Sequence, residues 1–150
     1  MIQRIQTLYL LAIVALGIAL IWLPVVQLVS PVEAEELQVW ELSALGGAPL
    51  QGLWGLLLTT ILIPVLAGID IFLFKKRLLQ ARLNIFLALL CLGYYGVLAI
   101  YIWQANLALG VDWHLMPSAC IPLVCFVLTL MATRRILKDE ALVRAADRIR

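Results

Sequence analysis

Charged residues divide the chain into four long stretches without Asp, Glu, Lys or Arg: residues 5–32, 42–69, 83–111 and 113–133. A helix that spans a membrane needs about 20 mostly apolar residues, so each stretch accommodates one spanning helix and not two. Runs such as LYLLAIVALGIALIWL lack the alternating polarity of a transmembrane β-barrel strand. Because a helix satisfies its own backbone hydrogen bonds in lipid, we predict four transmembrane helices. We place them at about residues 8–29, 52–74, 83–103 and 117–133.

Composition excludes the other broad classes of protein. Of the 150 residues, 65% are hydrophobic and 13% are charged. Soluble domains are about half apolar and about one-quarter charged, and disordered chains are more polar still. We therefore predict an all-α integral membrane protein, with a four-helix transmembrane bundle in residues 1–133 and a short tail in residues 134–150.

The basic residues predict how the bundle is oriented. All 11 Lys and Arg residues lie before the first predicted helix, between the second and third, or after the fourth. On the opposite side there is no Lys or Arg, and the charged residues are all acidic: Glu33, Glu35, Glu36, Glu41 and Asp112. Since Lys and Arg are retained in the cytoplasm, we expect both termini there. The bases would then face anionic lipids of the inner leaflet, and we expect no nucleic-acid partner.

The tail, RRILKDEALVRAADRIR, contains no Gly or Pro and is predicted to continue the fourth helix. Arg135 and Asp139 form an i,i+4 pair of opposite charge, as do Glu140 and Arg144. The tail also carries an apolar stripe at positions i, i+4 and i+7, made of Leu142, Ala146 and Ile149. The tail is interpreted either as a helix on the inner leaflet or as a docking site for a membrane or cytoplasmic protein.

Asp70 is the only acidic or basic residue placed inside a predicted span, and such residues are candidates for function. It lies five residues before Lys75, close to the inner boundary, so we expect an ion pair between the two. A transport role is the alternative, using Asp70 with helix kinks at Pro64 and Pro122, because a proline inside a helix removes a hydrogen bond.

Other chemical signals are weak. The three cysteines form no CxxC motif, and the single histidine has too few neighbouring ligands for a metal site. We predict no catalytic residue, metal or cofactor. The region of residues 30–51 is acidic and Trp-containing, and its pattern is compatible with a short strand or with one surface helix.

Three segments suggest a family: MIQRIQTLYLL at the start, FKKRLLQARLNIFLALL after the second predicted helix, and RRILKDEALVRAADRIR at the end. Together they resemble the bacterial domain-of-unknown-function family 4293, small four-helix membrane proteins of the Bacteroidetes. The resemblance covers the whole chain and implies an inner-membrane location in a bacterium with two membranes. It implies no activity.

The leading functional interpretation is a non-enzymatic accessory or scaffold subunit of the inner membrane. A small transporter or transport regulator is the first alternative. A membrane enzyme acting on lipid or quinone is the second, and it would need polar residues clustered at one depth.

Overall fold

In the computed structural model, residues 3–29, 34–38, 54–73, 76–109 and 112–147 are described. Within these residues the chain forms four α-helices: α1 (Gln3–Trp22), α2 (Trp54–Phe72), α3 (Arg77–Leu109) and α4 (Ile121–Asp147). Three strands accompany them: β1 (Pro24–Val29), β2 (Ala34–Gln38) and β3 (Asp112–Leu115). A 3₁₀ turn, η2 (Pro117–Cys120), leads into α4.

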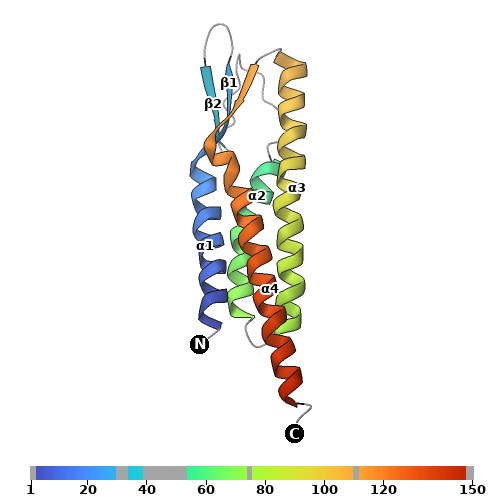
Figure 1. Cartoon of the computed structure of the whole chain (residues 1–150). Helices are drawn as coiled ribbons and strands as arrows, with labels where there is room; N and C mark the ends of the chain where they lie inside the picture. The colour runs from blue at the N-terminus through green and yellow to red at the C-terminus, as the bar shows by residue number, and fades with distance from the viewer. Residues whose placement is uncertain (1–2, 30–33, 39–53, 74–75, 110–111, 148–150) are drawn as a thin grey trace.

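The helices form an elongated bundle in which successive helices run in opposite directions (Figure 1). α1 packs against α2 and α4, and α3 packs against the same two helices. The start of α1 and the end of α4 lie at the same end of the bundle (Figure 1). Within the described residues, three helices, α2, α3 and η2–α4, contain segments long and apolar enough to cross a membrane. The predicted all-α membrane bundle is therefore confirmed.

The first predicted helix was placed too far along the chain. α1 ends at Trp22, and residues 24–29 form β1 instead of the last turns of a helix. Pro24 explains the difference, because the residue before a proline is driven out of helical geometry. At 1.5 Å per residue, the 20 residues of α1 extend about 30 Å, comparable with the apolar thickness of a bilayer.

The strands form one antiparallel sheet in the order β2-β1-β3. Val26 of β1 is opposite Leu37 of β2 and Leu115 of β3. Of the two structures considered for residues 30–51, residues 34–38 adopt the strand, and the remainder lies outside the described residues. The sheet caps the end of the bundle opposite to the start of α1 (Figure 1), and we call this the sheet end.

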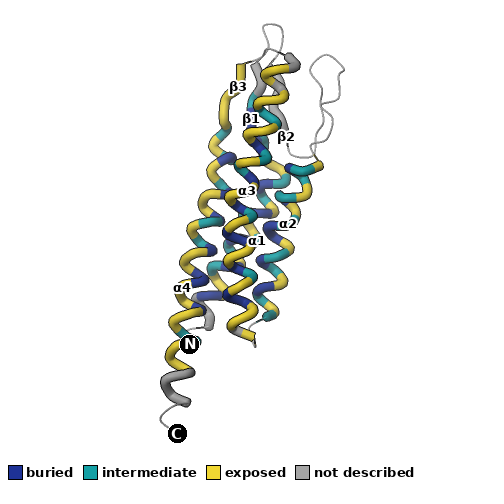
Figure 2. Tube along the Cα trace, turned by 90° about the vertical axis from the view of Figure 1, so that its right-hand side faces the viewer, coloured by how far each residue is buried: buried dark blue, intermediate teal, exposed yellow. Residues whose placement is uncertain are grey.

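Buried residues recur on every helix along the length of the bundle (Figure 2). They form two apolar clusters. The sheet-end cluster contains Leu20, Val25, Val26, Leu56, Tyr94, Leu98 and Ala119. The mid-bundle cluster contains Leu10, Ile13, Ile63, Ala67, Leu87, Cys91 and Cys125. The two free thiols Cys91 and Cys125 thus contribute to the core as small apolar groups, whereas Cys120 is exposed.

The closest packing between α1 and α2 occurs at Gly17 and Pro64. A Cβ atom added to Gly17 would lie 2.9 Å from Cδ of Pro64, which is closer than real side chains approach. The proline predicted to kink α2 therefore forms part of a helix interface. By contrast, a Cβ atom added to Gly93 or Gly96 would meet nothing within 4 Å, and both residues lie on the exposed face of α3.

Tyr95 joins α3 to the start of α4. Its hydroxyl donates to the carbonyl of Ala119 at 2.7 Å and accepts from the backbone N–H of Leu123 at 3.1 Å. These two backbone groups are four residues apart, so the hydroxyl occupies a position where a helical hydrogen bond would form. Pro122 leaves the carbonyl of Ser118 without its usual helical donor, and the N–H of Ile121 supplies one.

Candidate functional site

Buried polar side chains concentrate at the end of the bundle opposite to the sheet. This polar end is where α1 and α3 begin, α2 ends and α4 passes from its buried to its exposed part. Six of its described side chains are polar and buried: Gln6, Asp70, Gln80, Asn84, Thr129 and Thr133. Each helix therefore contributes at least one buried polar group to this end.

Asp70 and Asn84 lie at the centre of this group, on α2 and α3. Asp70 is 1% exposed and Asn84 is fully buried. The Asn84 amide donates from Nδ2 to Oδ2 of Asp70 at 2.6 Å. Gln80, one turn before Asn84, donates from Nε2 to the backbone carbonyl of Asp70 at 3.2 Å. Two amides of α3 therefore hold the last turn of α2.

The pair has two acceptor atoms without a partner. Neither Oδ1 of Asp70 nor Oδ1 of Asn84 has a hydrogen-bond donor. The remaining amide hydrogen of Asn84 is directed to the carbonyl of Gln80, with Nδ2 at 3.3 Å from that oxygen. That contact fixes the orientation of the Asn84 amide. With its nitrogen and oxygen exchanged, the amide oxygen would face the Gln80 carbonyl oxygen, and neither oxygen could donate a hydrogen bond.

The predicted partner of Asp70, Lys75, lies outside the described residues, so the ion pair between them stays a prediction. Among the described residues, the partner of the Asp70 carboxylate is an amide and not a cation. Asp70 is also two residues from the end of α2 at Phe72, which places it near the end of the span and away from its middle.

A second polar contact joins α1 to α4. Nε2 of Gln6 donates to Oδ2 of Asp139. Ile136, one turn earlier on α4, is 1% exposed and is the last buried residue in the described part of that helix. Asp139 therefore marks the point at which α4 leaves the bundle.

Beyond that point α4 continues past the ends of the other helices (Figure 1). The predicted helical continuation of residues 134–147 is present, without a break from the preceding span. In the predicted stripe, Leu142 is 55% exposed. Ala146 belongs to α4, but its side chain is not described, and Ile149 lies outside the described residues.

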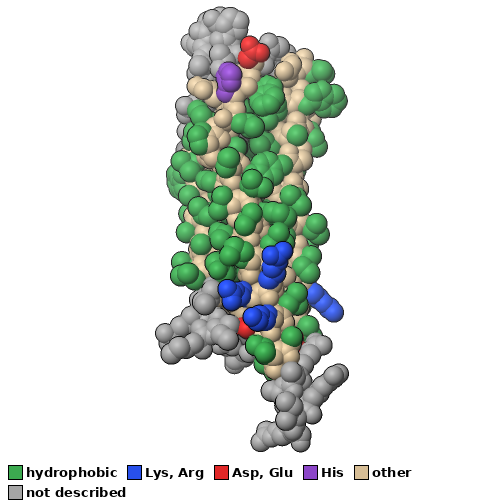
Figure 3. Space-filling model, viewed as in Figure 1, with side chains coloured by type: hydrophobic (Ala, Val, Ile, Leu, Met, Phe, Trp, Pro, Cys, Tyr) green, Lys and Arg blue, Asp and Glu red, His purple; other side chains and the backbone are tan. Residues whose placement is uncertain are grey.

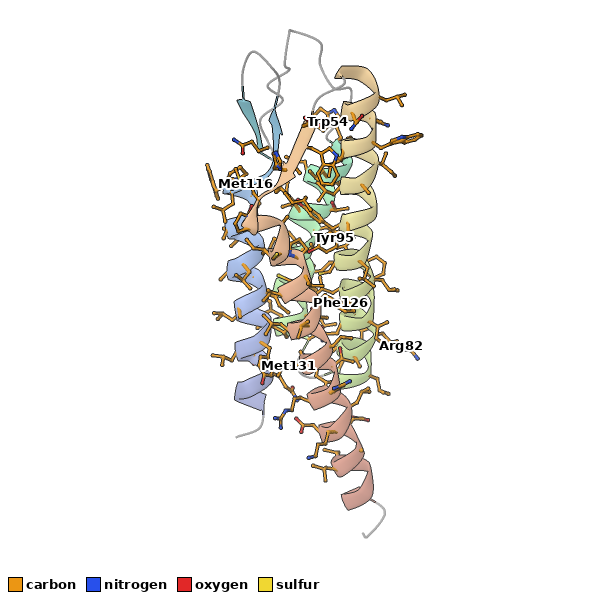
Figure 4. All side chains as sticks on the ribbon, turned by 45° about the horizontal axis from the view of Figure 1, so that its top comes forward. Trp54, Arg82, Tyr95, Met116, Phe126 and Met131 are labelled. Carbon is orange, nitrogen blue, oxygen red and sulfur yellow. The ribbon has the colours of Figure 1, made fainter. Side chains whose placement is uncertain are left out.

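The surface has opposite character at its two ends. The basic side chains visible in Figure 3 gather at the polar end, below a wide apolar band. Five basic residues with described side chains are exposed: Lys76, Arg82, Arg134, Arg135 and Lys138. Figure 4 shows Arg82 directed away from the bundle and Tyr95 within it. At the sheet end, Asp112 and His114 of β3 are exposed.

Among the described residues, no group of three or more His, Cys, Asp or Glu side chains could hold a metal ion. Sequence reasoning missed the roles of Gln80 and Asn84 because it followed charged residues. The available signal was their i,i+4 spacing, which places two amides on one face of a helix that is otherwise largely apolar.

The bundle, the apolar band and the buried amide–carboxyl pair define a small multi-helix membrane protein of the four-helix bundle class. The chain belongs to the family described as domain of unknown function (DUF4293), whose model matches residues 2–149. No curated protein and no solved structure matches the chain.

Proposed function

We propose that the chain is a non-enzymatic accessory or scaffold subunit of a bacterial inner membrane, with both ends in the cytoplasm, and that the end of α4 docks a cytoplasmic protein. Its orientation is supported by the exposed basic residues of the polar end, since Lys and Arg are retained on the cytoplasmic side. These bases would also contact anionic headgroups of the inner leaflet.

The observation that carries the proposal is the uninterrupted course of α4 from Ile121 to Asp147. A helix that lies on a membrane surface must turn away from the axis of the span before it. α4 instead continues along the bundle, and from Asp139 to Asp147 it advances about 12 Å at 1.5 Å per residue. This direction takes the tail away from the bilayer and favours a protein partner over a lipid surface.

The composition of the projecting segment defines the partner. Leu142, the member of the predicted stripe with a described side chain, is 55% exposed. An apolar stripe on an exposed helix fits a groove on another protein, a common mode of helix recognition. Because residues 134–150 contain six basic and three acidic residues, the groove is expected to have an acidic rim.

The test compares the full chain with a chain that ends after Glu140. This end point keeps buried Ile136 and the Gln6–Asp139 contact, so the bundle should remain intact. Each protein carries the same affinity tag and is purified from native membranes, and co-purifying proteins are quantified by mass spectrometry. A partner that docks on α4 is lost from the shortened protein.

A pair of point variants localises the contact. Leu142→Ser should release the partner, whereas Val143→Ser, about 100° further around the helix, should retain it. Equal recovery of every partner by the shortened and full-length proteins would show that the tail is not a docking site.

A further inference from the structure

The two unpartnered oxygens of Asp70 and Asn84 require an explanation. Both atoms are buried, and buried polar atoms in proteins nearly always have a hydrogen-bond partner. Leaving one unsatisfied is costly, because the atom has lost its hydrogen bonds to water and gained none in return. The two oxygens belong to side chains that are already joined by the Nδ2–Oδ2 hydrogen bond.

One added hydrogen would satisfy both atoms. A carboxylic acid and a primary amide are complementary: the amide N–H donates to one acid oxygen, and the acid O–H donates to the amide oxygen. The first of these bonds is present, from Nδ2 of Asn84 to Oδ2 of Asp70. We propose that Asp70 binds a proton on Oδ1 and donates it to Oδ1 of Asn84, so that the two residues form a proton-binding acid–amide pair between α2 and α3.

The surroundings of the pair favour a neutral acid. A buried carboxylate is costly unless it is paired with a cation or with several donors. Gln80, the other α3 side chain in contact with Asp70, is neutral and donates to its backbone. On α4, Thr133 donates its hydroxyl hydrogen to the carbonyl of Thr129, and Thr129 donates to that of Cys125. Neither hydroxyl hydrogen is left for the carboxyl group.

The charged groups of this end with described side chains are also engaged elsewhere or exposed. Asp139 of α4 accepts from Gln6 of α1. The basic side chains with described positions at this end are exposed at the surface: Lys76, Arg82, Arg134, Arg135 and Lys138. The proton would enter from water on this side, since Asp70 is two residues from the end of α2. No other bond is made or broken when it binds.

The proposal has a thermodynamic consequence. A folded chain that holds this proton binds more protons than an unfolded chain, whose carboxyl group would be ionised at neutral pH. Stability therefore decreases as pH rises, and the part that depends on Asp70 is lost once the proton leaves. Asp70→Asn reproduces the neutral pair, because its amide can donate to Oδ1 of Asn84 and accept from Nδ2.

The direct experiment is infrared spectroscopy of the full chain in lipid nanodiscs. A protonated carboxyl group has a C=O stretch that is separate from the ionised form and shifts in D2O. The wild type at neutral pH should show this band, and Asp70→Asn should lack it. Asp139→Asn, a matched change at another carboxyl group of the polar end, should keep it. Absence of the band in the wild type overturns the proposal without reference to any variant.

Thermal unfolding provides the second measurement. The midpoint of the wild type should fall from acidic to alkaline pH, and Asp70→Asn should remove most of that slope while Asp139→Asn leaves it. A slope that is the same in wild type and Asp70→Asn would contradict the proposal. An unfolding midpoint that rises with NaCl but not with choline chloride at fixed pH would also contradict the proposal, because a sodium ion would then occupy the site.

Discussion

Both ends of the bundle join the same pairs of helices, but α1 and α4 are joined by different means at the two ends. At the polar end, side-chain hydrogen bonds join α2 to α3 through Asp70 and Asn84, and α1 to α4 through Gln6 and Asp139. At the sheet end, α1 and α4 are joined through their adjoining strands β1 and β3. α2 and α3 are joined there by the N–H of Gly55, which donates to the hydroxyl of Tyr101 at 3.3 Å.

The difference follows from what surrounds each end. Apolar packing alone discriminates poorly between neighbours in a membrane, because lipid tails are as apolar as Leu. Hydrogen bonds at both ends therefore specify which helices pair, while the apolar clusters between them fill the core. A backbone ladder is available only at the sheet end, where the chain leaves its helices. The polar end, built from helices alone, must use side chains.

The largest effect is expected at the sheet end from Val26→Asp. Val26 is 1% exposed and belongs to the sheet-end cluster, so the change buries an uncompensated charge. We expect a loss of about 3–5 kcal/mol in the free energy of unfolding. The tryptophans with described side chains lie at this end, on α1, α2, α3 and β3, so their fluorescence reports the loss.

A matched change on the neighbouring strand provides the control. Leu115 of β3 is opposite Val26 but is 55% exposed. Leu115→Asp should therefore cost much less than Val26→Asp. Similar losses from both variants would mean that the sheet, and not the buried cluster, determines the stability of this end.

At the polar end, the corresponding change is Asn84→Leu. It removes the amide that donates to Asp70 and leaves a buried carboxyl group without that partner. We expect a loss of about 2–3 kcal/mol. Cys91 lies two turns further along the same helix and is fully buried, so its reaction with a thiol reagent reports opening of α3 once Cys120 is replaced by Ser and Cys125 by Ala.

The control for this change is Gln104→Leu, a polar-to-Leu substitution at an exposed position of α3. It should alter neither stability nor thiol reactivity. If Asn84→Leu instead perturbs the tryptophans before it increases thiol reactivity, the two ends are not independent, and the comparison between them fails.

The sequence predicts these two ends unequally. Apolar length is enough to predict the bundle, and the absence of Gly and Pro predicts the helical tail. Pro24 ends α1 in the structure. The predicted helix continued past this proline because its end was placed from the length of the apolar stretch. The strand pairing of β1 with β3 depends on residues nearly 90 positions apart, so no local pattern encodes it.

The candidate site was predicted only in part. Asp70 is identifiable because a carboxyl group in an apolar segment is rare. Its bond to Asn84 is not, because it depends on how α2 and α3 are rotated relative to each other. The small residues Gly93 and Gly96 of α3 are exposed, since side-chain size alone does not determine which face of a helix turns inward.

The smallest effect is expected between the two ends, at the contact of α1 with α2. Gly17→Ala adds a Cβ that would lie 2.9 Å from Cδ and 3.1 Å from Cβ of Pro64. The proline ring is rigid and lies inside α2, so the helices must separate slightly. Overpacking of this kind costs about 1–3 kcal/mol, against a gain of up to about 1 kcal/mol from the helix propensity of Ala.

We therefore expect Gly17→Ala to lower the free energy of unfolding by about 1 kcal/mol. Gly93→Ala is the matched control, because nothing lies within 4 Å of its added Cβ and only the gain in helix propensity remains. The contrast is measured by tryptophan fluorescence and thiol reactivity together. Because Gly17 lies between the two ends, both signals should change in parallel. A stabilising effect of both substitutions would show that α1 and α2 are held by their ends alone.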